Sequence, residues 1–411
     1  MLKNYFKIAI AVLKRRKFFT FISLFGISFT LTVLIIASAF IDHTISPAYP
    51  ETKRARSLYI QFLEKTNDKH SSINKGPLSI YFLNTYVKTM KTPEKVGICS
   101  YGQVTNTYVN NQKLELKIRY VNTDFWQVTE FLFIDGRAFN DQELANADHV
   151  AVITESTRNK YFGENVNAIG KYIETDNENY RVTGIVKDAP VSFGFTHGDI
   201  YLPYTTSKTD ITYHSLNGQY SAILLAKDKS DIPAIQKEYQ AIIDKKPMLD
   251  KGFTELYSFA DTYFTNHTRM EYGKFGDSGL TFAVTALSLI AFLFMLLPSL
   301  NLININISRI MERSSEIGVR KAFGASSRTL VYQFIIENLI LTAIGCIVGI
   351  VIACIVLAIV NSSGWIPGIH LSVNLTVLAV ALLCCIIFGL LTGVYPAWRM
   401  SRLQIVNALK A

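Results

Sequence analysis

Hydrophobic residues are concentrated in three long stretches of the chain, and a more polar section separates the first stretch from the second. Phe18–Ile41 and Ser278–Ser308 contain no charged residue, and Asn338–Trp398 contains only His370 as an ionisable group apart from its cysteines and tyrosine. A helix needs about 20 apolar residues to cross the ~30 Å hydrocarbon core of a bilayer. Each stretch is therefore long enough for at least one membrane-spanning helix.

The third stretch is too long for a single crossing. Its middle, Asn361–His370, contains two glycines and a proline, which favour a turn. We therefore predict two helices in this stretch, joined by a short turn. Together with one helix from each of the other two stretches, the pattern predicts four transmembrane helices.

The polar section between the first two stretches contains short apolar segments, as in a soluble mixed α/β domain. Apolar and β-branched residues at 57–62, 149–154 and 180–186 predict strands, and the patterns at 78–90, 155–163 and 232–243 predict helices. The predicted fold class is thus membrane α-helical, with an extracytoplasmic mixed α/β domain inserted between helices 1 and 2.

The predicted organisation follows from these boundaries. It comprises an interfacial amphipathic N-terminal helix at 1–17, transmembrane helices at 18–41, 278–307, 334–360 and 371–395, an extracytoplasmic domain at 42–277, a cytoplasmic loop at 308–333, an external turn at 361–370 and a cytoplasmic tail at 396–411. Ala37-Ser-Ala39 resembles a signal-peptide cleavage site. The apolar stretch is, however, longer than the ~7–15 residues of a signal peptide, so we expect a retained anchor.

The net charge of +9 determines the expected orientation. The first 17 residues contain six Lys or Arg side chains and no acid, residues 309–337 contain five against three acids, and residues 399–411 contain three and no acid. Basic residues beside transmembrane helices favour the cytoplasmic side. Both termini and the 308–333 loop are therefore predicted to be cytoplasmic. This placement also explains the basic composition without a nucleic-acid partner.

No catalytic, cofactor-binding or metal site is expected in the polar section. Gly163–Lys171 has the wrong spacing for a phosphate-binding loop, and Tyr172 follows where such a loop needs Ser or Thr. His197, His214 and His267 have no carboxylate at metal-binding spacing. Four of the five cysteines lie in apolar stretches, which leaves the role of Cys99 open.

Small residues and a proline within the apolar stretches are candidates for helix packing or bending. Gly345 and Gly349, and likewise Gly389 and Gly393, are four residues apart, a spacing that lets two helix backbones approach closely. Pro298 interrupts the second predicted helix, as a local bend or as a hinge. The glycine pairs indicate faces that can pack against another helix.

The loop after the second helix has a mixed charge pattern. Ser315–Phe323 suits a short amphipathic helix with Gly324 as its C-cap, but charge and period alone are equally compatible with a solvated loop. Basic, acidic and glycine residues follow one another here in a fixed order: Glu312, Arg313, Glu316, Ile317, Gly318, Arg320, Ala322, Gly324 and Ala325. This pattern resembles the signature of the MacB/FtsX-like ABC transporter permeases.

The same family resemblance extends to the rest of the chain. Gly393–Lys410 is similar to the closing signature of these permeases, with Ile405 in place of the usual proline and Lys410 in place of arginine. The polar section is more loosely similar to their MacB-like periplasmic core domain. The segments that match in order are Asn122–Phe125, Gly136-Arg137, Phe162-Gly163, Ile169–Lys171 and Val182–Val186.

This resemblance implies a permease subunit in the bacterial inner membrane, with no bound cofactor of its own. A cytoplasmic ABC ATPase would bind ATP and Mg²⁺, and since the sequence contains no Walker A motif, we expect the ATPase to be a separate chain. The expected ATPase contacts are Glu312, Arg313, Glu316, Ile317, Gly318, Arg320, Lys321, Ala322 and Gly324. A second permease copy or paralogue would complete a dimer, and a periplasmic adaptor and outer-membrane channel are possible further partners.

The implied mechanism is mechanotransmission, in which ATP hydrolysis moves the external domain to extrude a drug, peptide or lipoprotein-like substrate. The first two predicted spans contain no acid or base, which argues against a proton-driven carrier. Other functions remain as alternatives: an FtsX-like scaffold that regulates cell-envelope enzymes, a membrane sensor, or a membrane enzyme. A sensor would need a cytoplasmic output domain and would leave the last two spans unexplained.

Overall fold

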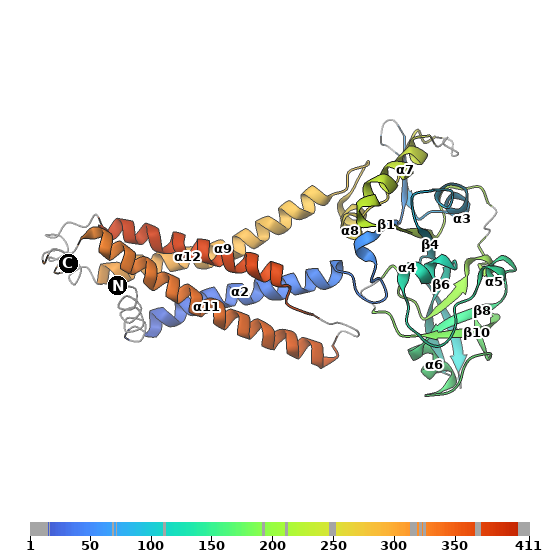
Figure 1. Cartoon of the computed structure of the whole chain (residues 1–411), viewed down its shortest axis with the longest axis horizontal. Helices are drawn as coiled ribbons and strands as arrows, with labels where there is room; N and C mark the ends of the chain where they lie inside the picture. Colours follow the sequence, from blue (N-terminus) through green and yellow to red (C-terminus); the bar gives the residue numbers. More distant parts are fainter. Residues whose placement is uncertain are drawn as a thin grey trace. The chain divides into compact units, whose positions relative to one another are not determined.

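The computed structural model describes residues 15, 17–67, 70, 72–109, 112–190, 194–209, 213–245, 252–312, 319, 323, 326–365 and 371–401. It divides into two compact units. The α/β unit is formed by residues 44–283, and the helical unit by the described parts of residues 1–43, 284–366 and 370–411. Figure 1 shows both units in the colours of the sequence.

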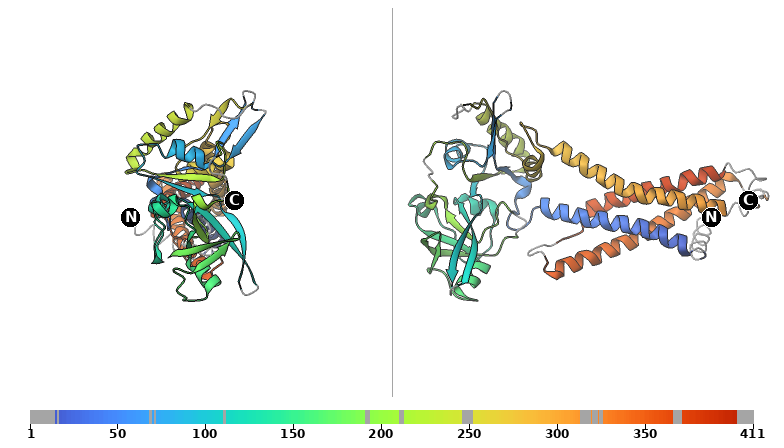
Figure 2. Two further views of the ribbon diagram at one scale, coloured as in Figure 1. Left: turned by 90° about the vertical axis from the view of Figure 1, so that its right-hand side faces the viewer. Right: turned by 180° about the vertical axis from the view of Figure 1, so that it is seen from behind.

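The helical unit consists of long helices that run alongside one another (Figure 2). They are α2 (Lys17–Ile45), α9 (Leu280–Glu312), α11 (Ser327–Ser363) and α12 (Leu375–Ser401). Ser326 caps α11 by accepting a hydrogen bond from the backbone N–H of Thr329 at 3.2 Å, and Gly364 ends it in the left-handed conformation. Residues 1–14, which include most of the predicted interfacial helix, lie outside the described residues.

Three of these helices are long and apolar enough to cross a membrane, by length and composition. The segments are Lys17–Ile45, Val331–Ser363 and Leu375–Val394. The apolar part of α9 among the described residues is the shorter Leu280–Leu296. The structure thus shows several apolar helices that suit a membrane, and a fourth span through α9 stays a prediction.

The helix ends differ from the boundaries predicted by charge. α9 continues to Glu312 where the sequence predicts an end at Ile307, and α11 begins at Ser327 where a start at Phe334 is predicted. A helix satisfies its own backbone hydrogen bonds, so it can extend beyond its apolar segment without a break. Part of the predicted 308–333 loop is therefore helical.

The α/β unit is built on a ten-stranded mixed sheet. Its main path is β1-β12-β4-β6-β11-β8-β10-β7, with β5 added beside β6 and β9 beside β10. The strands are β1 (Ser57–Ile60), β4 (Lys95–Ser100), β5 (Gln103–Val109), β6 (Gln112–Val121), β7 (Phe133–Gly136), β8 (Val150–Thr154), β9 (Tyr172–Thr175), β10 (Glu178–Val186), β11 (Ile200–Pro203) and β12 (Tyr220–Leu225). The β8/β10 and β6/β11 pairs are parallel, and the other pairs are antiparallel.

A second sheet and several short helices complete the unit. The three-stranded sheet has the order β13-β2-β3, formed by Glu255–Tyr257, Leu63–Thr66 and Ile73–Gly76. The helices are α3 (Ile80–Phe82), α4 (Asp124–Thr129), α5 (Asp141–Ala145), α6 (Glu155–Phe162), α7 (Ile232–Asp244) and α8 (Tyr263–Tyr272). The single helix predicted at 78–90 is instead α3 followed by a π-helical turn at Leu83–Val87.

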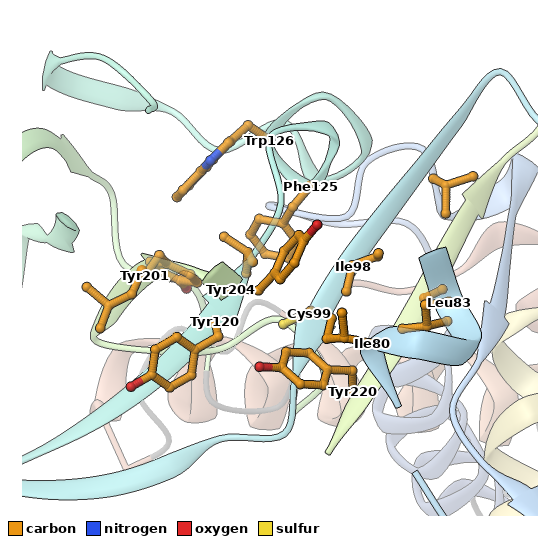
Figure 3. Packing of buried hydrophobic residues seen from close by; sticks show 14 of the residues in the cluster. Ile80, Leu83, Ile98, Cys99, Tyr120, Phe125, Trp126, Tyr201, Tyr204 and Tyr220 are labelled. Carbon is orange, nitrogen blue, oxygen red and sulfur yellow. The ribbon is translucent and has the colours of Figure 1, made fainter. Parts of the chain in front are cut away.

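Aromatic side chains fill much of the core of the α/β unit (Figure 3). Trp126 contacts Phe131 and Tyr201 edge-on, with ring centroids 5.7 and 5.4 Å apart. Cys99 lies in the same core with 0% of its surface exposed. Burial raises the pKa of its thiol to about 11, so the thiol stays protonated and unreactive at neutral pH. Cys99 is a packing residue.

Candidate functional site

Buried charged residues lie where the chain enters and leaves the α/β unit. Glu51 and Arg54 follow the end of α2, and Asp261 and Arg269 precede the start of α9. Their exposed fractions are only 3–8%. Charged side chains are rarely buried unless they are paired, so each of these should have a partner. We call these four residues the junction cluster.

Arg54 holds the last turn of α2. Its Nη1 donates hydrogen bonds to the backbone oxygens of Thr44 and Ser46, at 2.8 and 3.0 Å. Both oxygens lie at the C-terminal end of α2. Backbone carbonyls at this end of a helix have no hydrogen-bond partner within the helix, and the helix dipole makes this end negative. Nε and Nη2 both donate to Glu51 Oε2, at 3.1 Å each. The guanidinium therefore connects the end of α2 to the body of the α/β unit.

Glu51 is held from the other side by two hydroxyl groups. The Tyr59 hydroxyl donates to Glu51 Oε2 and the Thr196 hydroxyl to Oε1, each at 2.8 Å. Burial, and then the nearby Glu51 carboxylate, raise the pKa of Tyr59 well above its ordinary value. Tyr59 is consequently a permanent hydrogen-bond donor, and the Glu51 carboxylate accepts hydrogen bonds from Tyr59, Thr196 and Arg54.

The second ion pair holds the segment before α9. Arg269 Nη2 donates to Asp261 Oδ1 at 3.2 Å, and Nη1 donates to the backbone oxygen of Gly276 at 2.8 Å. The same guanidinium lies 3.9 Å from the ring centroid of Phe259, a cation–π contact. Gly276 lies between α8 and α9. Arg269 therefore binds the backbone just before α9, as Arg54 binds the backbone at the end of α2.

Aromatic contacts join the two ion pairs. Tyr59 and Asp261 exchange backbone hydrogen bonds of 2.7 and 3.1 Å, which fixes the departing segment against β1. Tyr263 packs edge-on against Tyr59 at 5.3 Å, and Arg54 lies 3.7 Å from the Tyr263 ring centroid. The junction cluster is therefore one connected structure. Breaking a buried ion pair costs about 3–5 kcal/mol, so the cluster ties both attachment segments firmly to the α/β unit.

In the helical unit, the four candidate glycines lie at helix–helix contacts. A Cβ atom at Gly345 would lie 2.7 Å from Ile27, and one at Gly349 would lie 2.8 Å from the Ser28 carbonyl oxygen, both on α2. The Thr32 hydroxyl also donates to the Gly349 oxygen at 3.0 Å. Only glycine leaves room for α2 and α11 to approach this closely.

The other glycine pair faces α11 from α12. A Cβ atom at Gly389 would lie 2.5 Å from the Thr342 hydroxyl oxygen, and one at Gly393 would lie 3.0 Å from Asn338 Nδ2. α11 thus lies between α2 and α12 and packs on each through a glycine pair. Pro298 lies within α9, but its side chain is outside the described residues.

Most of the candidate ATPase contacts fall outside the described part of the chain. Glu312 is the last residue of α9, without a described side chain, and Arg313, Glu316, Ile317, Gly318, Arg320, Lys321, Ala322 and Gly324 lie outside the described residues. Two neighbours are described. The Phe323 N–H donates to the Val319 oxygen at 3.0 Å, and their side chains are 88% and 45% exposed.

Two groups of polar residues were not found from the sequence. The junction cluster escaped because its members are ordinary surface types, and the Arg54–Tyr263 contact joins positions far apart in the chain. Glu337 of α11 is 1% exposed, and Gln333, Asn338 and Thr342 are buried close to it in sequence. Gln333 and Glu337, and likewise Asn338 and Thr342, are four residues apart, the same-face spacing of a helix that could have revealed these polar pairs. Among the described residues, no group of His, Cys, Asp or Glu is arranged to hold a metal ion.

Two family models match the chain, one after the other. A MacB-like periplasmic core domain matches residues 20–242, and an FtsX-like permease C-terminal domain matches residues 288–405. Together they cover most of the α/β unit and most of the described helices from α9 onwards, while β13 and α8 lie between the two matched ranges. The first model also covers most of α2, which precedes the α/β unit.

Curated relatives extend over most of the chain. A pyoverdine export ATP-binding/permease protein, PvdT of Pseudomonas fluorescens, is 27% identical over 80% of this chain and 51% of its own length. The macrolide export ATP-binding/permease proteins MacB of Pasteurella multocida and Salmonella typhimurium are 24% and 26% identical, over 73% and 79% of this chain and 44% and 49% of theirs. The chain thus spans about half the length of the relatives it matches.

Two solved structures show similarity to part of the chain. The periplasmic region of MacB from Actinobacillus actinomycetemcomitans gives a TM-score of 0.38 at 17% identity, covering 54% of this chain and 94% of that one. The extracellular domain of a noncanonic ABC-type transporter, YknZ from Gram-positive bacteria, gives 0.37 at 15% identity, covering 49% and 98%.

Proposed function

Because this chain belongs to the MacB/FtsX-like family of ABC transporter permeases, we propose that it is the membrane subunit through which a cytoplasmic ATPase moves an external domain. Four transmembrane helices, α2, α9, α11 and α12, cross the bacterial inner membrane with both termini in the cytoplasm. The α/β unit is extracytoplasmic. ATP and Mg²⁺ bind to a partner ATPase, and a second permease copy or paralogue forms the other half of the transporter.

The junction cluster is the observation that carries this proposal. A helix can transmit motion only if its end is fixed to the part that moves. Arg54 fixes the end of α2, and Arg269 fixes the segment that leads to α9, within one buried network. α2 and α9 therefore suit a pair of levers acting on the α/β unit. An efflux role agrees with the names of the pyoverdine and macrolide export relatives, and the cargo is proposed to be a drug, peptide or lipoprotein-like substance.

The input to these levers is proposed to be the segment between α9 and α11. Its signature residues, among them Glu316, Gly318, Arg320 and Lys321, would dock on the ATPase, and α9 leads directly to them. The exposed apolar side chains of Val319 and Phe323 suit a partner surface at the same place. Motion at this docking site would reach the junction cluster along α9 and, through the glycine contacts of α11, along α2.

Charge reversal in the docking segment tests the proposal. Arg320→Glu should abolish copurification of the ATPase and should uncouple ATP hydrolysis from efflux, because it would place an acid where the partner accepts a base. Arg328→Glu, on the exposed first turn of α11 and outside the signature, is the matched control and should keep both. Unchanged ATPase binding and unchanged efflux in Arg320→Glu would contradict the docking assignment.

The same preparation separates transport from the alternative functions. Copurification of an ATPase is expected for a transporter and for a scaffold that regulates envelope enzymes, but not for a solitary sensor. Accumulation assays with a fluorescent efflux substrate in cells with and without the permease then separate transport from scaffolding. A strain that loses envelope-enzyme regulation while its efflux is unchanged would favour the scaffold.

A further inference from the structure

A cavity of about 400 Å³ lies within the α/β unit, beside the junction cluster. Its size falls in the ~300–1,000 Å³ range of small-molecule sites. Its lining comes from β6, the turn after β4, the segment before β11 and α8. Thr44 and Tyr263, which contact Arg54, also line it. The side chains that line the cavity determine which ligand it can hold.

The cavity has a strongly positive wall. Lys117 and Arg119 both line it and are two residues apart on β6, a spacing that places both on one face of the sheet. No Asp or Glu is among its described lining residues. Among the described residues, neither the Lys117 ammonium nor the Arg119 guanidinium has a carboxylate oxygen within 4.0 Å. The Asp199 carboxylate instead accepts a hydrogen bond from the Lys117 backbone N–H.

Arg119 is unusual among the buried cations of the unit. Only 3% of it is exposed, whereas Arg54 and Arg269, which are similarly buried, each have a carboxylate partner. Among the described residues, the Arg119 guanidinium donates to the backbone oxygens of Ser100, His197 and Gly194, and the Cys99 thiol also lies beside it. Five N–H groups are available on a guanidinium, so these contacts leave room for a bond to a ligand. A buried cation without an anion is costly, and an anionic ligand would offset that cost.

Two glycines leave the space that these cations occupy. A Cβ atom at Gly102 would lie 2.1 Å from Lys117 Cε, and one at Gly198 would lie 2.6 Å from Arg119 Cγ. The Lys117 ammonium donates no hydrogen bond to any described residue. Burial, and then the neighbouring Arg119, lower the pKa of Lys117. The two positive charges are thus held close together although they repel each other, an arrangement that a shared anion would stabilise.

Other residues of the lining are apolar or aromatic. Phe195 and Tyr263 both line the cavity and both pack edge-on against Tyr59, at 5.6 and 5.3 Å, so their rings are fixed. Met270 and Tyr101 add further apolar surface. Such walls bind an apolar or aromatic group by area burial and ring contacts. Inorganic anions alone would leave them uncovered.

We propose that this cavity binds an organic anion, a carboxylate or phosphate attached to an apolar group. Its charge is bound by Lys117 and Arg119, and its apolar group lies against Phe195 and Tyr263. The site is separate from the ATPase-docking segment and does not depend on ATP-driven transport. Occupation of the site would also contact Tyr263 and Thr44, so a ligand bound there would touch the residues that fix the end of α2.

Isothermal titration calorimetry tests the proposal. The sample is the purified full chain in nanodiscs of zwitterionic lipid. The probe is 2-naphthoate, and 2-naphthamide is its neutral counterpart of nearly the same shape. We expect naphthoate to bind at least tenfold more tightly than naphthamide, and to bind more weakly as salt is added. Equal binding of the two compounds, or no binding of naphthoate, would overturn the proposal.

Variants on one strand locate the binding. Lys117→Gln should weaken naphthoate binding about tenfold, and Lys117→Arg should restore most of it because the charge is kept. Lys113→Gln, which removes an exposed lysine from the same strand, should leave the affinity unchanged. Circular dichroism of each variant verifies folding. If Lys117→Gln and Lys113→Gln bind naphthoate alike, the anion does not bind at this cavity.

Discussion

At the scale of single residues, the family motifs of the α/β unit correspond to contacts that bring backbones together. Asn122 is 1% exposed and bridges β4 to α4: its Oδ1 accepts from the N–H of Ile98 and Phe125, and its Nδ2 donates to the Val96 oxygen. Gly136 and Gly184 bring β7 against β10. A Cβ at Gly136 would lie 2.2 Å from the Thr183 oxygen. These motif residues stabilise the fold.

Replacement of Gly136 by alanine should therefore destabilise the α/β unit markedly. Its φ of +69° costs an L-residue about 1–2 kcal/mol, and the clash with Thr183 adds to that cost. Gly170→Ala is the matched control, since Gly170 has a φ of +81° with nothing within 4 Å of its Cβ. Urea unfolding followed by the fluorescence of the buried Trp126 should show a larger loss of stability for Gly136→Ala. Equal losses would mean that backbone conformation alone is responsible.

At the scale of elements, local patterns predicted some of the regular segments, missed others and did not predict the contacts between them. β8 (Val150–Thr154), α6 and α7 lie close to where period and capping residues predict them. The β5–β6 hairpin was not predicted, because β6 alternates Lys113, Glu115, Lys117 and Arg119 with apolar residues and resembles a solvated segment. The sequence predicted the glycine pairs as packing sites. It did not predict which helix each pair contacts, because that depends on tertiary packing and a local pattern contains no information about it.

The junction cluster gives a prediction about the attachment of α2. Arg54→Met should destabilise the α/β unit by about 3–5 kcal/mol, because it leaves the Glu51 carboxylate buried without its cation. Arg56→Met, two residues further on, removes an arginine from a partly exposed pair with Glu94 and should cost about 0–1 kcal/mol. Unfolding of both variants in urea measures the difference. In an efflux assay, Arg54→Met should also lose transport while still binding the ATPase.

A result in which the two arginine variants are equally stable would show that the buried pair contributes little. Loss of ATPase binding in Arg54→Met would instead mean that the helical unit itself is disturbed. Normal efflux by a stably folded Arg54→Met would contradict the lever role of α2, since the end of that helix would then transmit motion without its link to Glu51.

At the scale of the whole molecule, apolar length and charge placement predicted the division into helices and an α/β domain. They could do so because burying a charge in lipid is costly. Membrane segments therefore lack charged residues, which is visible in any short stretch of the sequence. The family relationship came from the Glu312–Ala325 and Gly393–Lys410 patterns, which charge and period alone do not explain. The junction cluster could not be predicted, since its ion pairs depend on β1 and α8 meeting in space, and the same holds for the cavity beside it.

The orientation of the chain is the prediction that belongs to this scale. In a cysteine-free background, a cysteine at Lys113, an exposed position of the β5–β6 hairpin, should react with a membrane-impermeant maleimide added to intact spheroplasts. A cysteine at Ser326, exposed before α11, should react only after the membrane is opened. Both outcomes follow from the basic residues at 1–17 and 309–337, which favour the cytoplasmic side of the helices they flank.

The reverse labelling pattern would place the α/β unit in the cytoplasm, and the lever mechanism would then have no external domain to move. Labelling of both sites in intact spheroplasts would instead show that α9 does not cross the membrane, because Lys113 and Ser326 are separated by that one predicted span.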